Sequence, residues 1–144
     1  MKIKRSNYIE IATSKYKLNE IPSKRIDYDK WIEFIEAHKD YFIWYEDTPD
    51  GIDAKENIDK VPEGFKDRVI HSLNKVSAYS TNKIVKMAYD FIVTYRTTGG
   101  TVSVSIERKM TKEIAEILLK MAKFLEGKVI VSGTKVLENI EQLE

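Results

Sequence analysis

The segment Met87-Ala-Tyr-Asp-Phe-Ile-Val-Thr-Tyr-Arg-Thr-Thr-Gly-Gly-Thr-Val-Ser-Val-Ser-Ile106 decides the fold. Apolar and polar side chains alternate on both sides of Gly99-Gly100, which is the period of a β-strand. Consecutive glycines accept the positive φ angles of a tight hairpin turn. We therefore predict an antiparallel hairpin, with its first strand over Ile84–Thr97 and its return strand over Val102–Glu107.

Shorter strands and amphipathic helices are predicted on both sides of this hairpin. The strands are expected at Tyr8–Thr13, Tyr41–Tyr45, Val76–Thr81 and Lys128–Val131. The helices are expected from Asp27 or Asp29 to Ala37, from Pro62 to Asn74, and from Thr111 to Leu125. The strands cluster in hairpins, so we predict an α+β domain: a mainly antiparallel sheet of about five or six strands, with about three helices packed on one face. The tail after Val136 fits either a strand or a helix.

Length and composition point to one globular domain over residues 1–144, rich enough in aromatic side chains to form a core. The absence of cysteine excludes disulfides, thiolate nucleophiles and Cys-ligated metals. The basic start of the chain is not followed by an apolar signal core, and the most hydrophobic helical stretch contains charged residues. We therefore expect a soluble, cytoplasmic protein.

The sequence contains no recognisable catalytic or cofactor motif. Its two histidines do not form an HExxH or comparable metal-binding spacing, and no Gly-x-Ser-x-Gly elbow occurs. Gly99-Gly100 lacks the lysine and hydroxyl residue of a phosphate-binding loop. An EF-hand alignment on Gly51 places Asn57 where a glutamate is required, which leaves only a looser cation site at Asp47, Asp50 and Asp53 as an alternative. The prediction is therefore a non-enzymatic protein without cofactor or metal, although catalysis stays open.

Charge is distributed unevenly along a chain whose net charge is only +1. Residues 31–60 carry three basic and nine acidic side chains, a net charge of −6. The aromatic run Tyr41-Phe-Ile-Trp-Tyr45 leads directly into this acidic stretch, which we expect to be a loop over residues 47–59. Aromatic anchors beside charges are typical of a protein-binding hot spot.

The leading hypothesis is therefore a binding protein, in one version an inhibitor or immunity-type protein, that recognises a partner with a basic surface. The expected contact residues are Trp44, Tyr45, Glu46, Asp47, Asp50, Asp53, Glu56 and Asp59.

Two other function classes remain as alternatives. The first is a small-molecule-binding domain or enzyme, with a pocket between the sheet and the helices lined by Tyr41, His71, Tyr89, Asp90 and Tyr95. The second is nucleic-acid binding, which the low net charge disfavours. Its candidate residues are Lys2, Lys4, Arg5, Lys15, Lys17, Lys24 and Arg25, with Tyr8 and Tyr16. Self-association through a sheet edge is compatible with all three hypotheses, and the sequence does not identify the partner.

Overall fold

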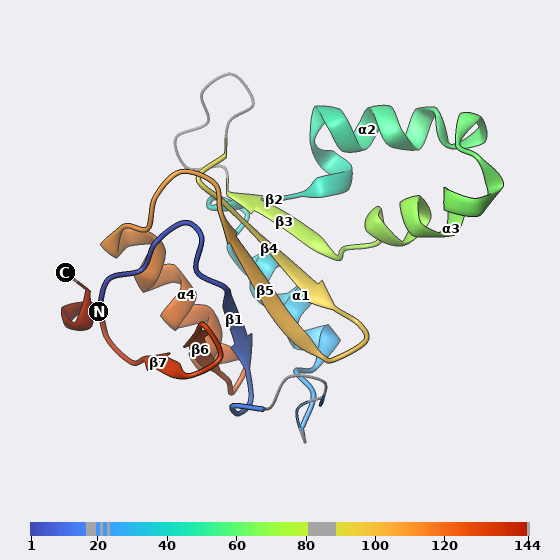
Figure 1. Cartoon of the computed structure of the whole chain (residues 1–144). Helices are drawn as coiled ribbons and strands as arrows, with labels where there is room; N and C mark the ends of the chain where they lie inside the picture. Colours follow the sequence, from blue (N-terminus) through green and yellow to red (C-terminus); the bar gives the residue numbers. More distant parts are fainter. Residues whose placement is uncertain (17–19, 21, 23, 81–88, 144) are drawn as a thin grey trace.

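A computed structural model describes residues 1–16, 20, 22, 24–80 and 89–143. Within these residues a seven-stranded antiparallel sheet has the strand order β2-β3-β4-β5-β1-β6-β7 (Figure 1). The strands are β1 (Ile9–Ala12), β2 (Phe42–Trp44), β3 (Ser77–Ser80), β4 (Phe91–Arg96), β5 (Thr101–Ile106), β6 (Lys128–Val131) and β7 (Lys135–Leu137). The α+β class and the antiparallel sheet are therefore confirmed.

The predicted hairpin forms the centre of the sheet as β4 and β5. Its register runs from Phe91 opposite Ile106 to Arg96 opposite Thr101. Gly100 has a φ of 68°, the left-handed conformation that the turn requires. Of the residues predicted to face inward, the following are buried: Phe91, Val93, Tyr95, Val102, Val104 and Ile106. Tyr89, predicted on the same face, is half-buried, and Met87 lies outside the described residues. The part of the predicted strands at 81 and 84–88 lies outside the described residues.

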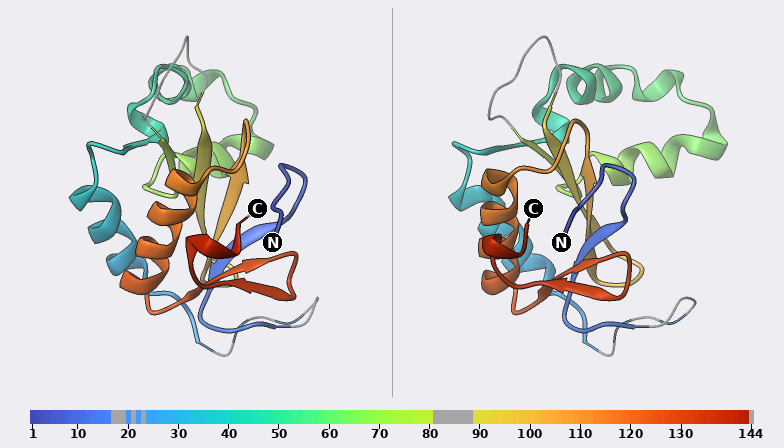
Figure 2. Two further views of the ribbon diagram at one scale, coloured as in Figure 1. Left: turned by 90° about the vertical axis from the view of Figure 1, so that its left-hand side faces the viewer. Right: turned by 60° about the vertical axis from the view of Figure 1, so that its left-hand side comes forward.

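Helices α1 (Tyr28–Ala37) and α4 (Lys112–Phe124) lie together against one face of the sheet (Figure 2). Asp27 caps α1 and Thr111 caps α4, since each side chain accepts a hydrogen bond from a backbone N–H of the first turn. Trp31, Phe34 and Ile35 of α1 are buried in the core, as their spacing predicts. These two helices are the ones that supply buried apolar side chains to the core.

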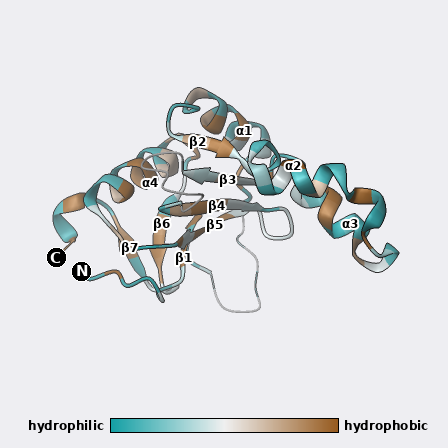
Figure 3. Cartoon of the chain, turned by 90° about the horizontal axis from the view of Figure 1, so that it is seen from above, coloured by the Kyte–Doolittle hydropathy of each residue, from teal (hydrophilic) through white to brown (hydrophobic). Residues whose placement is uncertain are grey.

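The other two α-helices of the described chain form an arm that projects beyond the edge of the sheet (Figures 1 and 3). We call α2 (Pro49–Glu56), the short 3-10 helix η2 (Ile58–Lys60) and α3 (Glu63–Ser72) the helical arm. A further 3-10 helix, η1 (Tyr45–Asp47), joins it to β2. The arm is weakly apolar, and Ile52, Phe65 and Ile70 are about half exposed on it.

The expectation of a loop over residues 47–59 is wrong. Thr48 accepts a hydrogen bond from the N–H of Gly51 and thereby caps α2, while Pro49 occupies the first helical turn. The same residue types that reverse a chain also start a helix. Gly51 packs so closely on η1 that a Cβ atom there would lie 1.9 Å from the carbonyl oxygen of Tyr45.

The C-terminal tail adopts both alternatives that its sequence left open. Strand β7 pairs with β6, and a 3-10 helix, η3 (Ile140–Gln142), follows it. None of the helices in the described ranges combines the length and the apolar character that crossing a bilayer requires.

Candidate partner-binding surface

The root of the helical arm is closed by Glu46, a residue of η1. Its Oε2 accepts a hydrogen bond from the backbone N–H of Lys75 at 2.7 Å. Lys75 follows the arm, and its carbonyl accepts the indole N–H of Trp31 at 3.0 Å. Oε1 of Glu46 is buried and has no hydrogen-bond partner among the described residues. Glu46 is only 8% exposed. It therefore joins the two ends of the arm, and the prediction that it forms part of the contact surface is not compatible with its burial.

Trp44 is also part of the interior, with 2% of its surface exposed. Its ring packs against Trp31, with centroids 5.9 Å apart, and its indole N–H donates to Oε1 of Glu36 at 2.9 Å. That hydrogen bond lowers the pKa of Glu36 below its ordinary value. The alternation of β2 turns Phe42 and Trp44 toward the core, so the expectation of an accessible Trp44 is wrong.

Tyr45 points away from the core and joins two other tyrosines. Its ring stacks on that of Tyr79 in β3, with centroids 5.6 Å apart and planes at 26°. The ring of Tyr89 meets Tyr79 edge-on at 4.9 Å. All three side chains are half-buried. We call Tyr45, Tyr79 and Tyr89 the tyrosine cluster. Because Tyr79 pairs with Ile43 and Ile92, and alternates with buried Ala78, it lies on the sheet face opposite α1 and α4.

An aspartate of the arm influences this cluster electrostatically. Burial raises the pKa of both Tyr79 and Tyr89, and the negative charge of Asp50 raises both further. Glu107, at the end of β5, adds to the effect on Tyr79. Asp50 lies in the first turn of α2, where the helix dipole favours a negative side chain. The cap at Thr48 thus fixes the start of the helix that carries Asp50, whose charge acts on Tyr79 and Tyr89.

The other acidic residues of the predicted site lie along the arm. Asp47 forms an ion pair with Lys39 at 3.8 Å, and Asp53 accepts a hydrogen bond from Asn57. Within the described ranges, no ion pair is formed by Asp50, Glu56 or Asp59. The exposed acidic residues are Asp47, Asp50, Asp53, Glu56 and Asp59. Five of the eight predicted contact residues are thus exposed, Tyr45 is half-buried, and Trp44 and Glu46 are buried.

These carboxylates do not form a metal centre. Among the described residues, no group of three or more histidine, aspartate or glutamate side chains is arranged to hold a metal ion. The looser cation site considered at Asp47, Asp50 and Asp53 is therefore not formed. Their spacing along α2 and η1 distributes the three charges over the arm instead of directing them to one point.

Comparisons of the chain with protein-family models, with curated proteins and with solved structures find no match. The functional evidence is accordingly the chemistry of the chain's own surfaces and pockets.

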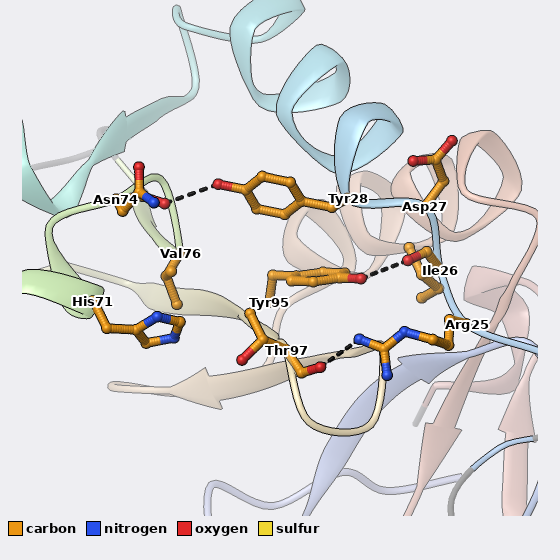
Figure 4. Close-up of a pocket in the computed structure, with 9 residues that line it drawn as sticks. All are labelled: Arg25, Ile26, Asp27, Tyr28, His71, Asn74, Val76, Tyr95 and Thr97. Atoms are coloured by element: carbon orange, nitrogen blue, oxygen red, sulfur yellow. Dashed lines mark hydrogen bonds between the residues drawn. The ribbon is translucent and has the colours of Figure 1, made fainter. Parts of the chain in front are cut away.

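The residues expected to line one pocket between the sheet and the helices lie in three places. His71 and Tyr95 line a pocket of about 480 Å³ at the root of the arm (Figure 4). Tyr41 and Asp90 line another pocket, of about 360 Å³, near the start of α4. There Asp90 lies 3.9 Å from Arg108. Tyr89 belongs to the tyrosine cluster. The space between the sheet and the two packed helices is itself filled by core side chains such as Trp31 and Phe91.

Three side chains of the nucleic-acid alternative, those of Tyr8, Tyr16 and Arg25, form hydrogen bonds within the chain. The guanidinium of Arg25 donates to the carbonyls of Thr97 and Thr98 in the β4–β5 turn. The hydroxyl of Tyr16 donates to the buried Glu10 at 2.6 Å. Lys17 lies outside the described residues. Arg25 therefore holds the hairpin turn, and Tyr16 covers a carboxylate of β1.

Proposed function

We propose that the protein is a non-enzymatic binding protein that recognises a basic protein partner. The proposed contact surface comprises the tyrosine cluster and the exposed acidic residues of η1 and the helical arm, and we call it the tyrosine–acid surface. The observation that carries the proposal is the stacking of Tyr45 on Tyr79, with ring centroids 5.6 Å apart, directly before the exposed carboxylates of η1 and α2. An inhibitor of a basic enzyme is one form that this function would take.

The chemistry of this surface matches lysine and arginine side chains. A cation over the face of a tyrosine ring is attracted by the ring quadrupole, and a neighbouring carboxylate adds an ion pair. Tyrosine also brings a large contact area at low entropy cost, which is why it is common at binding hot spots. Glu56 and Asp59, which form no ion pair with any described residue, extend the negative potential along the arm and would speed the approach of a basic partner.

Residues that the sequence pattern grouped in one contact surface have two different roles in this proposal: some position the arm, and others contact the partner. The inward-facing rings of β2 and the buried Glu46 position the arm, and they contribute to binding only through that position. The outward-facing Tyr45 and the exposed acids offer the contacts. Phe65 and Ile70 of α3 add apolar area to the arm, since these side chains are 55% and 50% exposed.

The decisive experiment compares two variants with the same change in net charge. In the first, four acids of the arm are neutralised: Asp50→Asn, Asp53→Asn, Glu56→Gln and Asp59→Asn. In the control, four exposed acids elsewhere are neutralised: Glu33→Gln, Glu116→Gln, Glu138→Gln and Glu141→Gln. Partners captured by the wild-type protein from native cells are identified, and their affinity for each purified variant is then measured.

We expect a basic partner whose affinity decreases at least about tenfold with the arm variant, as the loss of several close charge contacts implies. The control variant should bind like the wild-type protein. The Tyr79→Ala variant should weaken binding but leave the salt dependence of the affinity unchanged. Neutralising the acids of the arm should instead reduce that salt dependence. Equal loss in the arm and control variants would show a general charge effect and would contradict the proposed surface.

A further inference from the structure

The pocket at the root of the arm combines an apolar floor with a polar rim. Ile26, Val76 and Tyr95 are buried and form the floor, whereas Arg25, His71 and Thr97 are exposed. In Figure 4 His71 of α3 and Asn74, which follows the arm, lie across the pocket from Arg25. A volume of about 480 Å³ is within the range of small-molecule sites, which share this division between floor and rim.

Arg25 supplies a fixed positive charge at one end of this pocket. Its Nη1 donates to the carbonyl of Thr98 at 3.0 Å, and its Nη2 donates to the carbonyl of Thr97. A guanidinium has five N–H groups, so three remain for a ligand. Within the described ranges, Arg25 forms no ion pair with a carboxylate. The carboxylate of Asp27, which also lines the pocket, accepts the backbone N–H of Asp29 as the cap of α1.

Two tyrosines form a rigid aromatic wall beside this charge. The rings of Tyr28 and Tyr95 lie 5.3 Å apart. The hydroxyl of Tyr95 donates to the carbonyl of Ile26 at 2.6 Å, and that of Tyr28 donates to the carbonyl of Asn74 at 2.9 Å. Because both hydroxyl protons are used by the fold, the rings are held in place. Tyr95 is only 3% exposed and supports the wall from behind, so the half-buried Tyr28 offers the apolar surface to a ligand.

We propose that this pocket binds a small aromatic carboxylate. The carboxylate of the ligand pairs with the free N–H groups of Arg25, and its ring packs against Tyr28, which Tyr95 supports from behind. The side-chain amide of Asn74, just after the arm, provides a further polar contact at the opposite end. This site is separate from the tyrosine–acid surface and does not depend on the proposed protein partner.

The test uses the full chain and 2-naphthoate as the probe, titrated by calorimetry and by NMR of the backbone amides. We expect saturable binding, with shift changes at Arg25, Asn74 and Thr97. The Arg25→Gln variant should bind at least about tenfold more weakly, as expected for the loss of a charged hydrogen-bond donor. Arg5→Gln, an exposed arginine outside the pocket, is the matched control and should bind like the wild-type protein.

Three further measurements make the test decisive. The neutral alcohol 2-naphthylmethanol and the ringless anion acetate should each bind much more weakly than 2-naphthoate, because each lacks half of the recognised chemistry. Thr97→Trp is a second variant in case Arg25→Gln disturbs the hairpin turn. Position 97 is exposed, and a tryptophan there should block the pocket and abolish binding. Unchanged affinity of a folded Arg25→Gln or Thr97→Trp variant, or equal binding of the alcohol, would overturn the proposal. Shift changes confined to other parts of the chain would overturn it as well.

Discussion

Glu46 and Lys75 stand 29 positions apart, yet a carboxylate oxygen of the first accepts the backbone N–H of the second at 2.7 Å. The bond joins the segment that enters the helical arm to the segment that leaves it. Lys75 has a φ of 52°, so its backbone adopts a left-handed conformation that a lysine rarely takes. The buried Glu46 and the indole of Trp31 both bind this residue, which fixes the turn and with it the direction of the arm.

Replacing Glu46 should therefore weaken the fold at the root of the arm. Glu46→Ala leaves the N–H of Lys75 without its acceptor and should lower the free energy of unfolding by about 1–3 kcal/mol. Glu46→Gln keeps an oxygen that accepts this hydrogen bond, so it should lower the free energy of unfolding by less. Urea denaturation measures both, with Glu33→Ala, an exposed residue of α1, as the control. A loss for Glu46→Ala no larger than for Glu33→Ala would mean that this bond does not hold the arm.

A second prediction distinguishes folding from binding at Trp44. Trp44→Ala removes a buried ring and should lower the free energy of unfolding by about 3–5 kcal/mol. Trp44→Phe retains an aromatic ring but loses the hydrogen bond to Glu36, so it should be destabilised less. Partner affinity measured on the folded Trp44→Phe protein should equal that of the wild-type protein. A large loss of affinity without a loss of stability would instead favour Trp44 as a contact residue.

Sequence periodicity predicted the central hairpin because local rules determine it. Alternation places Val93 and Val104 on one face, and Gly100 provides the positive φ of the turn. The helix over residues 49–56 was missed because Thr48 and Pro49 are compatible with both a turn and a capped helix. Short-range patterns do not decide between these two structures when the following helix has little apolar character.

The candidate site was harder to predict because it depends on tertiary arrangement. The alternation of β2 directs Trp44, and Tyr45 just after it, to opposite faces of the sheet. Only the position of α1 decides which of these two faces becomes the core. Tyr79 could have been found, since it alternates with Ala78 in a predicted strand. Its contact with Tyr45 requires β2 and β3 to be neighbours, which the sequence does not show.

A third prediction concerns stability in acid. The hydrogen bond from Trp44 lowers the pKa of Glu36 in the folded protein below its ordinary value of 4.5. The charged form is therefore favoured by folding, and this contribution is fully present above pH 4.5 and is lost as the pH falls through the lower, folded-state value. Glu36→Gln removes the titration but leaves an oxygen for the indole N–H. Thermal unfolding below pH 4.5 should consequently depend less on pH in this variant than in the wild-type protein. Identical acid dependence in the two proteins would contradict the prediction.

The last prediction tests whether Asp50 lies beside the tyrosine cluster. Burial and the charge of Asp50 raise the pKa of Tyr79 and Tyr89 above the ordinary value of 10.0. Folding thus favours the neutral phenols, and their contribution to stability is complete below pH 10.0 and is lost as the pH rises through the raised values. Asp50→Asn removes one cause of the increase, so both phenols should ionise at lower pH.

The measurement for this prediction is NMR of protein labelled with ¹³C at the tyrosine Cζ, followed through alkaline pH. The Asp59→Asn variant, which neutralises an exposed acid in η2, serves as the control because neither of these two tyrosines responds to Asp59. The titration curves of Tyr79 and Tyr89 should move in Asp50→Asn and remain in place in Asp59→Asn. Because screening by salt weakens a charge effect at an exposed carboxylate, the difference between the variants should also decrease at high ionic strength. Equal curves in both variants at low salt would show that the charge of Asp50 does not act on the tyrosine cluster, and would leave the proposed binding surface without a link between its rings and its acids.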